Sequence, residues 1–189
     1  MVFPSTVDGY IESVFTKTDF PPVGKKVMRA AKRLYKRKLF RPLRVFTIKR
    51  LFALLNKENS AVCKKVRFLR ISDRFAYSRD GEFSVFDLKT AVFGAKDFIT
   101  CIVLHEAAHA ILAAMDNYGE LKALDRAFFE RFNQKDAVAI SPIEYYATLY
   151  SIEMLEDLET VVKDGKLEAR AEHERKRLQT AYDIIIAEK

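Results

Sequence analysis

The residues best suited to chemistry lie in Ile102–Leu112, where His105, Glu106 and His109 form the pattern His-Glu-x-x-His. On a helix the two histidines are one turn apart and project from the same face. That spacing lets two imidazole nitrogens bind one zinc ion at about 2.0–2.1 Å each. Glu106 is rotated by about 100° from His105, so it flanks the metal. There it can act as the general base towards a zinc-activated water.

The residues around this pattern argue for a site inside the protein. The chain has only three histidines, and two of them fall at this spacing. Ala107, Ala108 and Ala110, with aliphatic residues on both sides, are typical of a buried helix. Polar groups in a buried helix need partners to offset their desolvation. The alternative is a chance match, with a solvated glutamate and two hydrogen-bonded histidines, but the surroundings favour a metal site.

At this point the chain resembles the zincin metallopeptidases, over a stretch from about Phe83 through Leu158. That family has a strand, then a helix with His-Glu-x-x-His, then a later helix with a third protein ligand. The resemblance implies hydrolysis of peptide bonds in a peptide or protein substrate, with Zn²⁺ as the cofactor. His105 and His109 would hold the metal and Glu106 would be catalytic. A third protein ligand leaves the fourth position open.

The best candidate for the third ligand is Glu144, in the segment SPIEYYATLY that spans Ser141–Tyr150. This segment resembles Glu-Phe-Phe-Ala-x-x-Phe on the third-ligand helix of the anthrax lethal factor family. Thr148 departs from the pattern, because many zincins with a glutamate ligand have an acidic residue there. Ser141, Pro142 and Glu144 also form a capping box, which alone would explain the glutamate.

Other residues remain as alternatives for the third ligand. Glu153 with Asp157 matches the Glu-x-x-x-Asp arrangement of other zincins with a glutamate ligand, and His173 lies in a charged helical stretch that favours a solvated histidine. Cys101 precedes His105 by one turn. Residues that span two turns of a straight helix cannot all reach one small ion, so Cys101 is expected to be packed in the interior.

The order of the expected elements predicts the α+β class. The expected architecture is a zincin-like core with a small, mostly antiparallel sheet, followed by C-terminal helices and preceded by basic helices. An Asp-Gly pair at 80–81 predicts a hairpin. Thr47 is expected to cap the second helix. Helices are expected at 25–39, 48–56, 97–115, 120–132, 141–162 and 166–187, and strands at 66–71, 75–78, 82–86 and 90–93.

Charge divides the expected single domain, 1–189, into two parts. Residues 1–80 carry 20 Lys and Arg against 6 Asp and Glu, and residues 81–189 carry 13 against 20. The first part is predicted to be a basic helical region with the first strand, and the second the zincin-like core. The basic region around Lys25–Lys38 predicts a nucleic acid or anionic surface as partner, unless its cations are only solvated. The alternative function is therefore a non-catalytic binding protein with a structural or vestigial metal site.

Composition excludes several classes of protein. With 49% hydrophobic and 31% charged residues the chain is not of the disordered class. Two cysteines exclude a disulfide scaffold and favour a reducing compartment. No apolar run approaches the roughly 18 residues of a membrane span. The first residues lack the pattern of a signal peptide, so a cytoplasmic location is expected.

Overall fold

The computed structural model describes residue 9 and residues 22–35, 41–58, 63–79, 82–132, 141–156 and 166–187. The chain divides into two compact units. The sheet unit comprises Pro21–Ala114 and Tyr150–Lys163, and the helical unit comprises Met1–Phe20, Met115–Leu149 and Asp164–Lys189. No helix among the described residues is long and apolar enough to cross a membrane.

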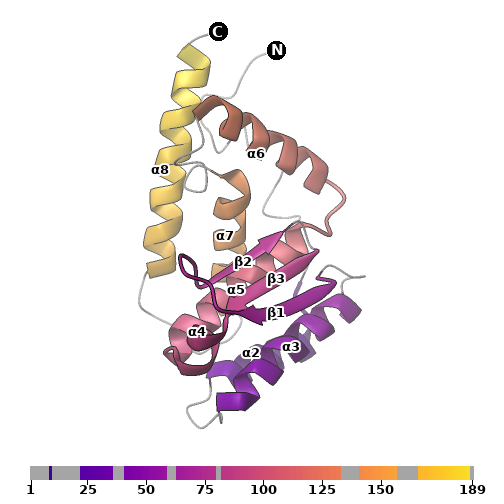
Figure 1. Cartoon of the computed structure of the whole chain (residues 1–189). Helices are drawn as coiled ribbons and strands as arrows, with labels where there is room; N and C mark the ends of the chain where they lie inside the picture. The colour runs from indigo at the N-terminus through magenta and orange to yellow at the C-terminus, as the bar shows by residue number, and fades with distance from the viewer. Residues whose placement is uncertain are drawn as a thin grey trace. The chain divides into compact units, whose positions relative to one another are not determined.

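The order of the elements confirms the α+β class (Figure 1). The helical unit contains α6 (Tyr118–Phe132) and α8 (Lys166–Ala187), and α7 (Pro142–Glu156) passes from it into the sheet unit after Leu149. The sheet unit contains α2 (Lys25–Tyr35), α3 (Arg41–Glu58), β1 (Lys65–Leu69), β2 (Ala76–Arg79), β3 (Phe83–Asp87), α4 (Leu88–Phe93) and α5 (Lys96–Leu112).

The three-stranded sheet is mixed, which corrects the prediction of a mostly antiparallel sheet. Its order is β1-β3-β2, with β1 parallel to β3 and β2 antiparallel to β3. The β2–β3 pair is the predicted hairpin, although residues 80 and 81 at its turn lie outside the described residues. A local turn specifies that pair, whereas the parallel pairing of β1 with β3 depends on contacts distant in sequence.

One face of the sheet packs against helices. Ser78 pairs with Ser84 and Phe68 pairs with Phe86, so these four side chains share a face. The ring of Phe86 lies 5.8 Å from that of Phe52 on α3, in an edge-to-face contact. α5 also packs against β2. The strand alternation predicted from the sequence therefore determines which side chains reach these helices.

The expected fourth strand at 90–93 is wrong, because this segment lies in the helix α4. Asp87 is the N-cap, and its side chain accepts bonds from the backbone nitrogen and the hydroxyl of Thr90, each at 2.7 Å. These two bonds hold the pKa of Asp87 below its ordinary value. Gly94 ends the helix, with its nitrogen 2.8 Å from the carbonyl oxygen of Thr90. Side-chain capping thus overrides the β-propensity of Thr90, Val92 and Phe93.

The second helix also begins earlier than predicted. α3 starts at Arg41, with Pro42 as its second residue, where proline is well tolerated. Thr47 is therefore inside the helix and not at its N-cap. The hydroxyl of Thr47 donates to the carbonyl oxygen of Leu43 at 2.7 Å, which satisfies a buried polar group.

The helix that carries the His-Glu-x-x-His pattern is buried on several sides. Eleven of the 17 residues of α5 are buried, and they include His105 and Glu106.

In the helical unit, the start of α7 is held by Asp125 of α6. Its carboxylate accepts bonds from the Ser141 hydroxyl and from the Ile143 nitrogen. Residues 157–165, over which α7 was predicted to continue and then break, lie outside the described residues.

Candidate metal centre

His105 and His109 face each other across one turn of α5. Their Nε2 atoms are 3.2 Å apart, and their rings stand almost perpendicular, with centroids separated by 4.7 Å. His105 is 8% exposed, and His109 is half-buried. The helix therefore presents two imidazole nitrogens side by side, as the sequence spacing predicts.

This separation of the two nitrogens fits a tetrahedral metal. Two ligands at about 2.0–2.1 Å from zinc, with a tetrahedral angle between them, are about 3.3 Å apart. The 3.2 Å between the two Nε2 atoms is close to that value. It also suits a hydrogen bond between two neutral imidazoles with complementary tautomers. The imidazoles therefore fit zinc without a large movement of either ring.

Glu144, the predicted third ligand, lies in the helical unit, whereas His105 and His109 lie in the sheet unit. Glu144 is half-buried on the first turn of α7. Two histidines and one carboxylate are donors typical of catalytic zinc sites, so Glu144 stays the predicted third ligand.

The alternative ligands lie on three different helices. Glu153 lies on α7 and His173 on α8, and both side chains are exposed. Cys101 is half-buried on α5, one turn before His105.

The capping role of Ser141 does not compete with metal binding by Glu144. The Ser141 hydroxyl accepts a hydrogen bond of 3.1 Å from the backbone nitrogen of Glu144. That bond uses the backbone of Glu144 and not its carboxylate. Ser141 is therefore the N-cap of α7, as predicted, and it caps the helix through the backbone of Glu144.

Glu106 is a buried carboxylate with a partner on the sheet. It is 5% exposed, and the Ser78 hydroxyl on β2 donates to its Oε2 at 2.6 Å. The Ser78 hydroxyl is also 2.8 Å from that of Ser84, and the Cys63 thiol is 3.5 Å from the Ser84 hydroxyl. We call Cys63, Ser78 and Ser84 the serine–thiol chain. It connects β2 and β3 to the carboxylate of Glu106.

The serine–thiol chain was not found from the sequence. Cys63 has no neighbouring motif, and neither serine belongs to one. A weak signal was present, because Ser78 and Ser84 occupy core-facing positions of β2 and β3, where apolar residues are the rule. Two polar side chains on a buried sheet face indicate a polar partner on the helix that covers it.

Comparisons with protein-family models, with curated proteins and with solved structures found no match for this chain. The zincin resemblance therefore stays a prediction from the residues, and the function is proposed from the site itself.

Proposed function

We propose that this protein is a zinc-dependent metallopeptidase that hydrolyses peptide bonds. The observation that carries the proposal is the pair of Nε2 atoms of His105 and His109, 3.2 Å apart, with the buried carboxylate of Glu106 on the next residue of the same helix. Glu144 is the proposed third ligand. Zinc bound there would supply a Lewis acid that polarises the substrate carbonyl and lowers the pKa of the attacking water.

Glu106 is proposed to move the protons of the reaction. Its carboxylate takes a proton from the attacking water and returns one to the leaving amine, as general base and then general acid. A buried carboxylate is useful for this only if it is held in one orientation. The bond from Ser78, at 2.6 Å, supports such an orientation.

The edge strand β2 is proposed to hold the substrate in an extended form. β2 pairs with β3 along one edge, and no other strand among the described residues pairs with its second edge. A peptide added along such an edge gains main-chain hydrogen bonds without dependence on its sequence. Ser78 lies in β2 and donates to Glu106, so a peptide on this strand would pass close to the general base.

The first test is the metal content of the purified full-length chain. We expect about one zinc per chain by elemental analysis, and less than about a tenth of that after His105→Ala, because two of three ligands bind weakly. His173→Ala is the matched control and should retain the metal, since His173 is an exposed histidine on α8. Equal zinc in the two variants would contradict the proposal.

A second pair of variants tests the third ligand on α7. Glu144→Ala should weaken zinc binding by at least about tenfold in a competition titration with a chelator, whereas Glu153→Ala should not. Both substitutions remove a carboxylate from the same helix, so the net charge changes equally. A larger loss for Glu153→Ala would assign the third ligand to Glu153.

The test of catalysis is Glu106→Gln. The variant should retain zinc and lose hydrolysis of a mixture of unstructured peptides, read by mass spectrometry, by at least about a thousandfold. Glutamine keeps the shape and a carbonyl oxygen for Ser78, but it cannot accept the proton. Cleavage by this variant at the rate of the native chain would disprove the role of Glu106.

The alternative is a non-catalytic binding protein that uses the basic N-terminal region. In α2, Val27, Ala31 and Leu34 are buried, and the helix contains no acidic residue. Its exposed cations are Lys25, Lys26, Arg29 and Arg33. Residues 36–38 of the predicted basic segment lie outside the described residues.

This arrangement favours a polyanion such as nucleic acid. Its test is a titration with a short DNA duplex at several salt concentrations. The alternative function would be favoured if DNA binding fell steeply with salt and were unchanged in Glu106→Gln and His105→Ala. The native chain would then also be expected to contain no zinc and to hydrolyse no peptide.

A further inference from the structure

The face of the sheet that points away from α5 carries a surplus of cations. Ser78, Ser84 and Phe86 point towards the helices, so the strand residues that alternate with them point the other way. In Figure 1 the strands lie in front of α5, so this second face is turned to the viewer. We call it the outer sheet face. Its eight strand residues are Lys65, Arg67 and Leu69 of β1, Tyr77 and Arg79 of β2, and Phe83, Val85 and Asp87 of β3.

Phe83 lies between cations on the outer sheet face. Lys65 of β1 pairs with Phe83 on one side, and Arg79 of β2 pairs with it on the other. Neighbouring strands are about 4.8 Å apart, so both cations lie next to the phenylalanine. The central carbon of the Arg67 guanidinium is 5.6 Å from the centre of the Phe83 ring, in a cation–π contact. Three cations therefore surround one aromatic ring on a single surface.

A second aromatic ring lies beside Phe83. The ring centres of Tyr77 and Phe83 are 6.2 Å apart, and the ring planes meet at 78°. Both aromatic side chains are half-buried, whereas the side chains of Lys65, Arg67 and Arg79 are exposed. The outer sheet face thus combines aromatic rings with exposed cations.

The cations of the outer sheet face are not neutralised by the described part of the chain. None of Lys65, Arg67 and Arg79 forms an ion pair with a described residue. Asp87 is the only acid among the eight residues, and it is buried and accepts two hydrogen bonds from Thr90. The partner that complements this surface is therefore a polyanion.

We propose that the outer sheet face binds a single polynucleotide strand. Lys65, Arg67 and Arg79 contact its phosphates. One unpaired base stacks on the Tyr77 ring, and the next stacks on the Arg67 guanidinium, which the Phe83 ring supports. Proteins commonly hold unpaired bases by stacking on aromatic rings and on arginine planes. Cations and rings recognise phosphates and base faces, which RNA and DNA share, so the strand is recognised whatever its sugar.

Other polyanions fit the outer sheet face less well. The base faces of a duplex are stacked on each other, and its grooves admit a helix or a two-stranded ribbon but not the broad face of this three-stranded sheet. An acidic peptide would neutralise the cations, but it has no bases to stack on the rings. A single strand satisfies both the charges and the aromatic rings.

The proposed strand binding does not depend on the proposed hydrolysis. Ser78, the residue of β2 that donates to Glu106, points to the opposite face of the sheet from Tyr77 and Arg79. The outer sheet face also differs from α2, the basic helix of the alternative function. Glu106→Gln should therefore bind the single strand as the native chain does, whether or not the native chain hydrolyses peptides.

The experiment is a fluorescence anisotropy titration of the full-length chain with labelled strands of about 15 nucleotides, a length that spans one binding site. An oligo-dT strand, an oligo-U strand and a DNA duplex of equal length are compared at the same salt concentration. We expect both single strands to bind, with affinities within about threefold of each other, and the duplex to bind at least about tenfold more weakly.

Removal of the three cations should change the salt dependence of binding. The triple variant Lys65→Ala/Arg67→Ala/Arg79→Ala should bind either strand at least about tenfold more weakly at physiological salt. Each phosphate contact with a single strand contributes about 0.7 to the slope of log affinity against log salt concentration. Loss of three contacts should therefore make the slope shallower by about 2. All three side chains are exposed, so circular dichroism should show an unchanged fold.

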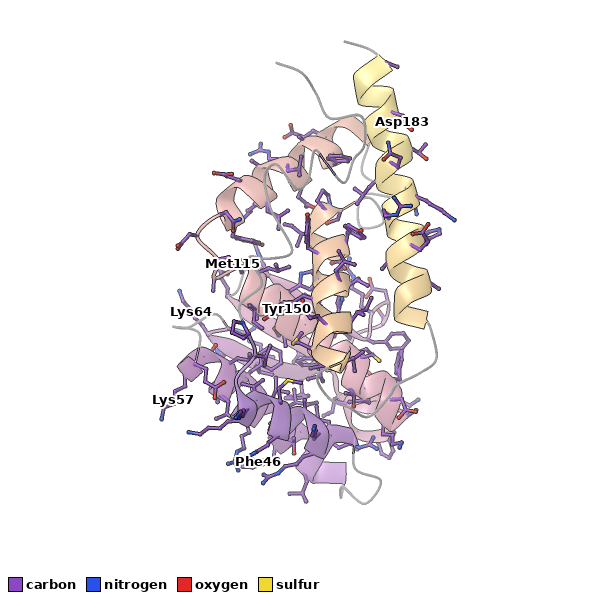
Figure 2. All side chains as sticks on the ribbon, turned by 180° about the vertical axis from the view of Figure 1, so that it is seen from behind. Phe46, Lys57, Lys64, Met115, Tyr150 and Asp183 are labelled. Carbon is purple, nitrogen blue, oxygen red and sulfur yellow. The ribbon has the colours of Figure 1, made fainter. Side chains whose placement is uncertain are left out.

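Matched variants control for net charge. Lys26→Ala/Arg29→Ala/Arg33→Ala also removes one lysine and two arginines, all exposed, but from α2. It should weaken strand binding by less than about threefold. At a single position, Lys65→Glu is compared with Lys57→Glu, which alters an exposed lysine of α3 (Figure 2). The reversal at Lys65 should weaken binding at least about threefold more.

A substitution of Tyr77 tests the stacking. Tyr77→Leu retains apolar bulk but removes the aromatic ring, and it should weaken binding at least about fivefold, because each stacked base contributes about that much or more. Tyr77→Phe retains the ring and should bind as the native chain does. Circular dichroism of both variants checks that the sheet is intact.

Each contrary result overturns the proposal. Absence of binding to both strands shows that the outer sheet face has another partner. Equal affinity for duplex and single strand, or equally effective competition by polyglutamate, shows that charge alone drives the binding. A larger loss for the α2 variant than for the sheet variant assigns the binding to α2.

Discussion

Removal of the Ser78 hydroxyl tests whether the serine–thiol chain positions the carboxylate of Glu106. The distance of 2.6 Å between the Ser78 hydroxyl and Oε2 lies in the range of charge-assisted O–H···O⁻ bonds. Hydrogen bonds to charged groups contribute about 1.5–3 kcal/mol, and the 5% exposure of Glu106 limits replacement of the hydroxyl by water. Ser78→Ala should therefore destabilise the fold by about 1.5–3 kcal/mol.

The same loss should appear in the reaction if the orientation of Glu106 limits proton transfer. Each 1.4 kcal/mol of lost transition-state stabilisation lowers the rate tenfold, so kcat/KM should fall by about ten- to a hundredfold, mainly through kcat. Ser78→Thr, which retains the hydroxyl, should restore most of the rate. Ser84→Ala is the control one bond further from the carboxylate and should change kcat less than threefold.

A double-mutant cycle measures the contact without any substrate. Unfolding by urea is followed for the native chain, Ser78→Ala, Glu106→Ala and the double variant by far-ultraviolet circular dichroism, because the chain has no tryptophan. The coupling energy between the two positions should exceed about 1 kcal/mol. A coupling below about 0.3 kcal/mol, with kcat unchanged in Ser78→Ala, would refute the positioning role of Ser78.

Two further predictions concern the short helix α4. Asp87→Ala should destabilise the protein by about 1 kcal/mol at pH 7 in urea unfolding, while Asp87→Asn keeps a capping oxygen and should cost less. Because its bonds with Thr90 hold the pKa of Asp87 below the ordinary 3.8, its contribution is present above that pH and disappears as the pH falls through the lowered pKa. The gap between Asp87→Ala and the native chain should therefore narrow in acid, and a constant gap would contradict the capping role. Gly94→Ala should lower the thermal midpoint, because a Cβ would lie 2.7 Å from both the Thr90 carbonyl oxygen and the Ile99 side chain. Gly119→Ala, where a Cβ meets nothing within 4 Å, should raise the midpoint or leave it unchanged.

Local patterns in the sequence were sufficient for several parts of the structure. The periodicity around His105 and His109 predicts one helix with both imidazoles on one face, and α5 has that arrangement. Ser141 as the cap of α7 was also predicted, because N-capping depends on a few neighbouring residues. The hairpin of β2 and β3 follows from an Asp-Gly pair between two alternating segments. In each case the determining contacts are close in sequence.

Predictions from the propensities of single residues were wrong at two places. The segment at 90–93 has residues typical of strands, but the cap at Asp87 and the close contact at Gly94 make it helical. Thr47 resembled an N-cap because hydroxyl residues favour that position, whereas Pro42 marks the actual start of α3. Propensity alone is a weak guide when a neighbouring side chain satisfies the backbone instead.

The sequence by itself determined the candidate chemistry of this protein: two imidazoles one helical turn apart, with a carboxylate beside them. Only the tertiary structure decided the parallel pairing of β1 with β3, the bond from Ser78 to Glu106 and the bond from Arg44 to the carbonyl oxygen of Gly94. The physical reason is the range of the interactions. Helical periodicity and capping act over three or four residues, whereas these features join segments up to about fifty residues apart, which only the packed chain brings together.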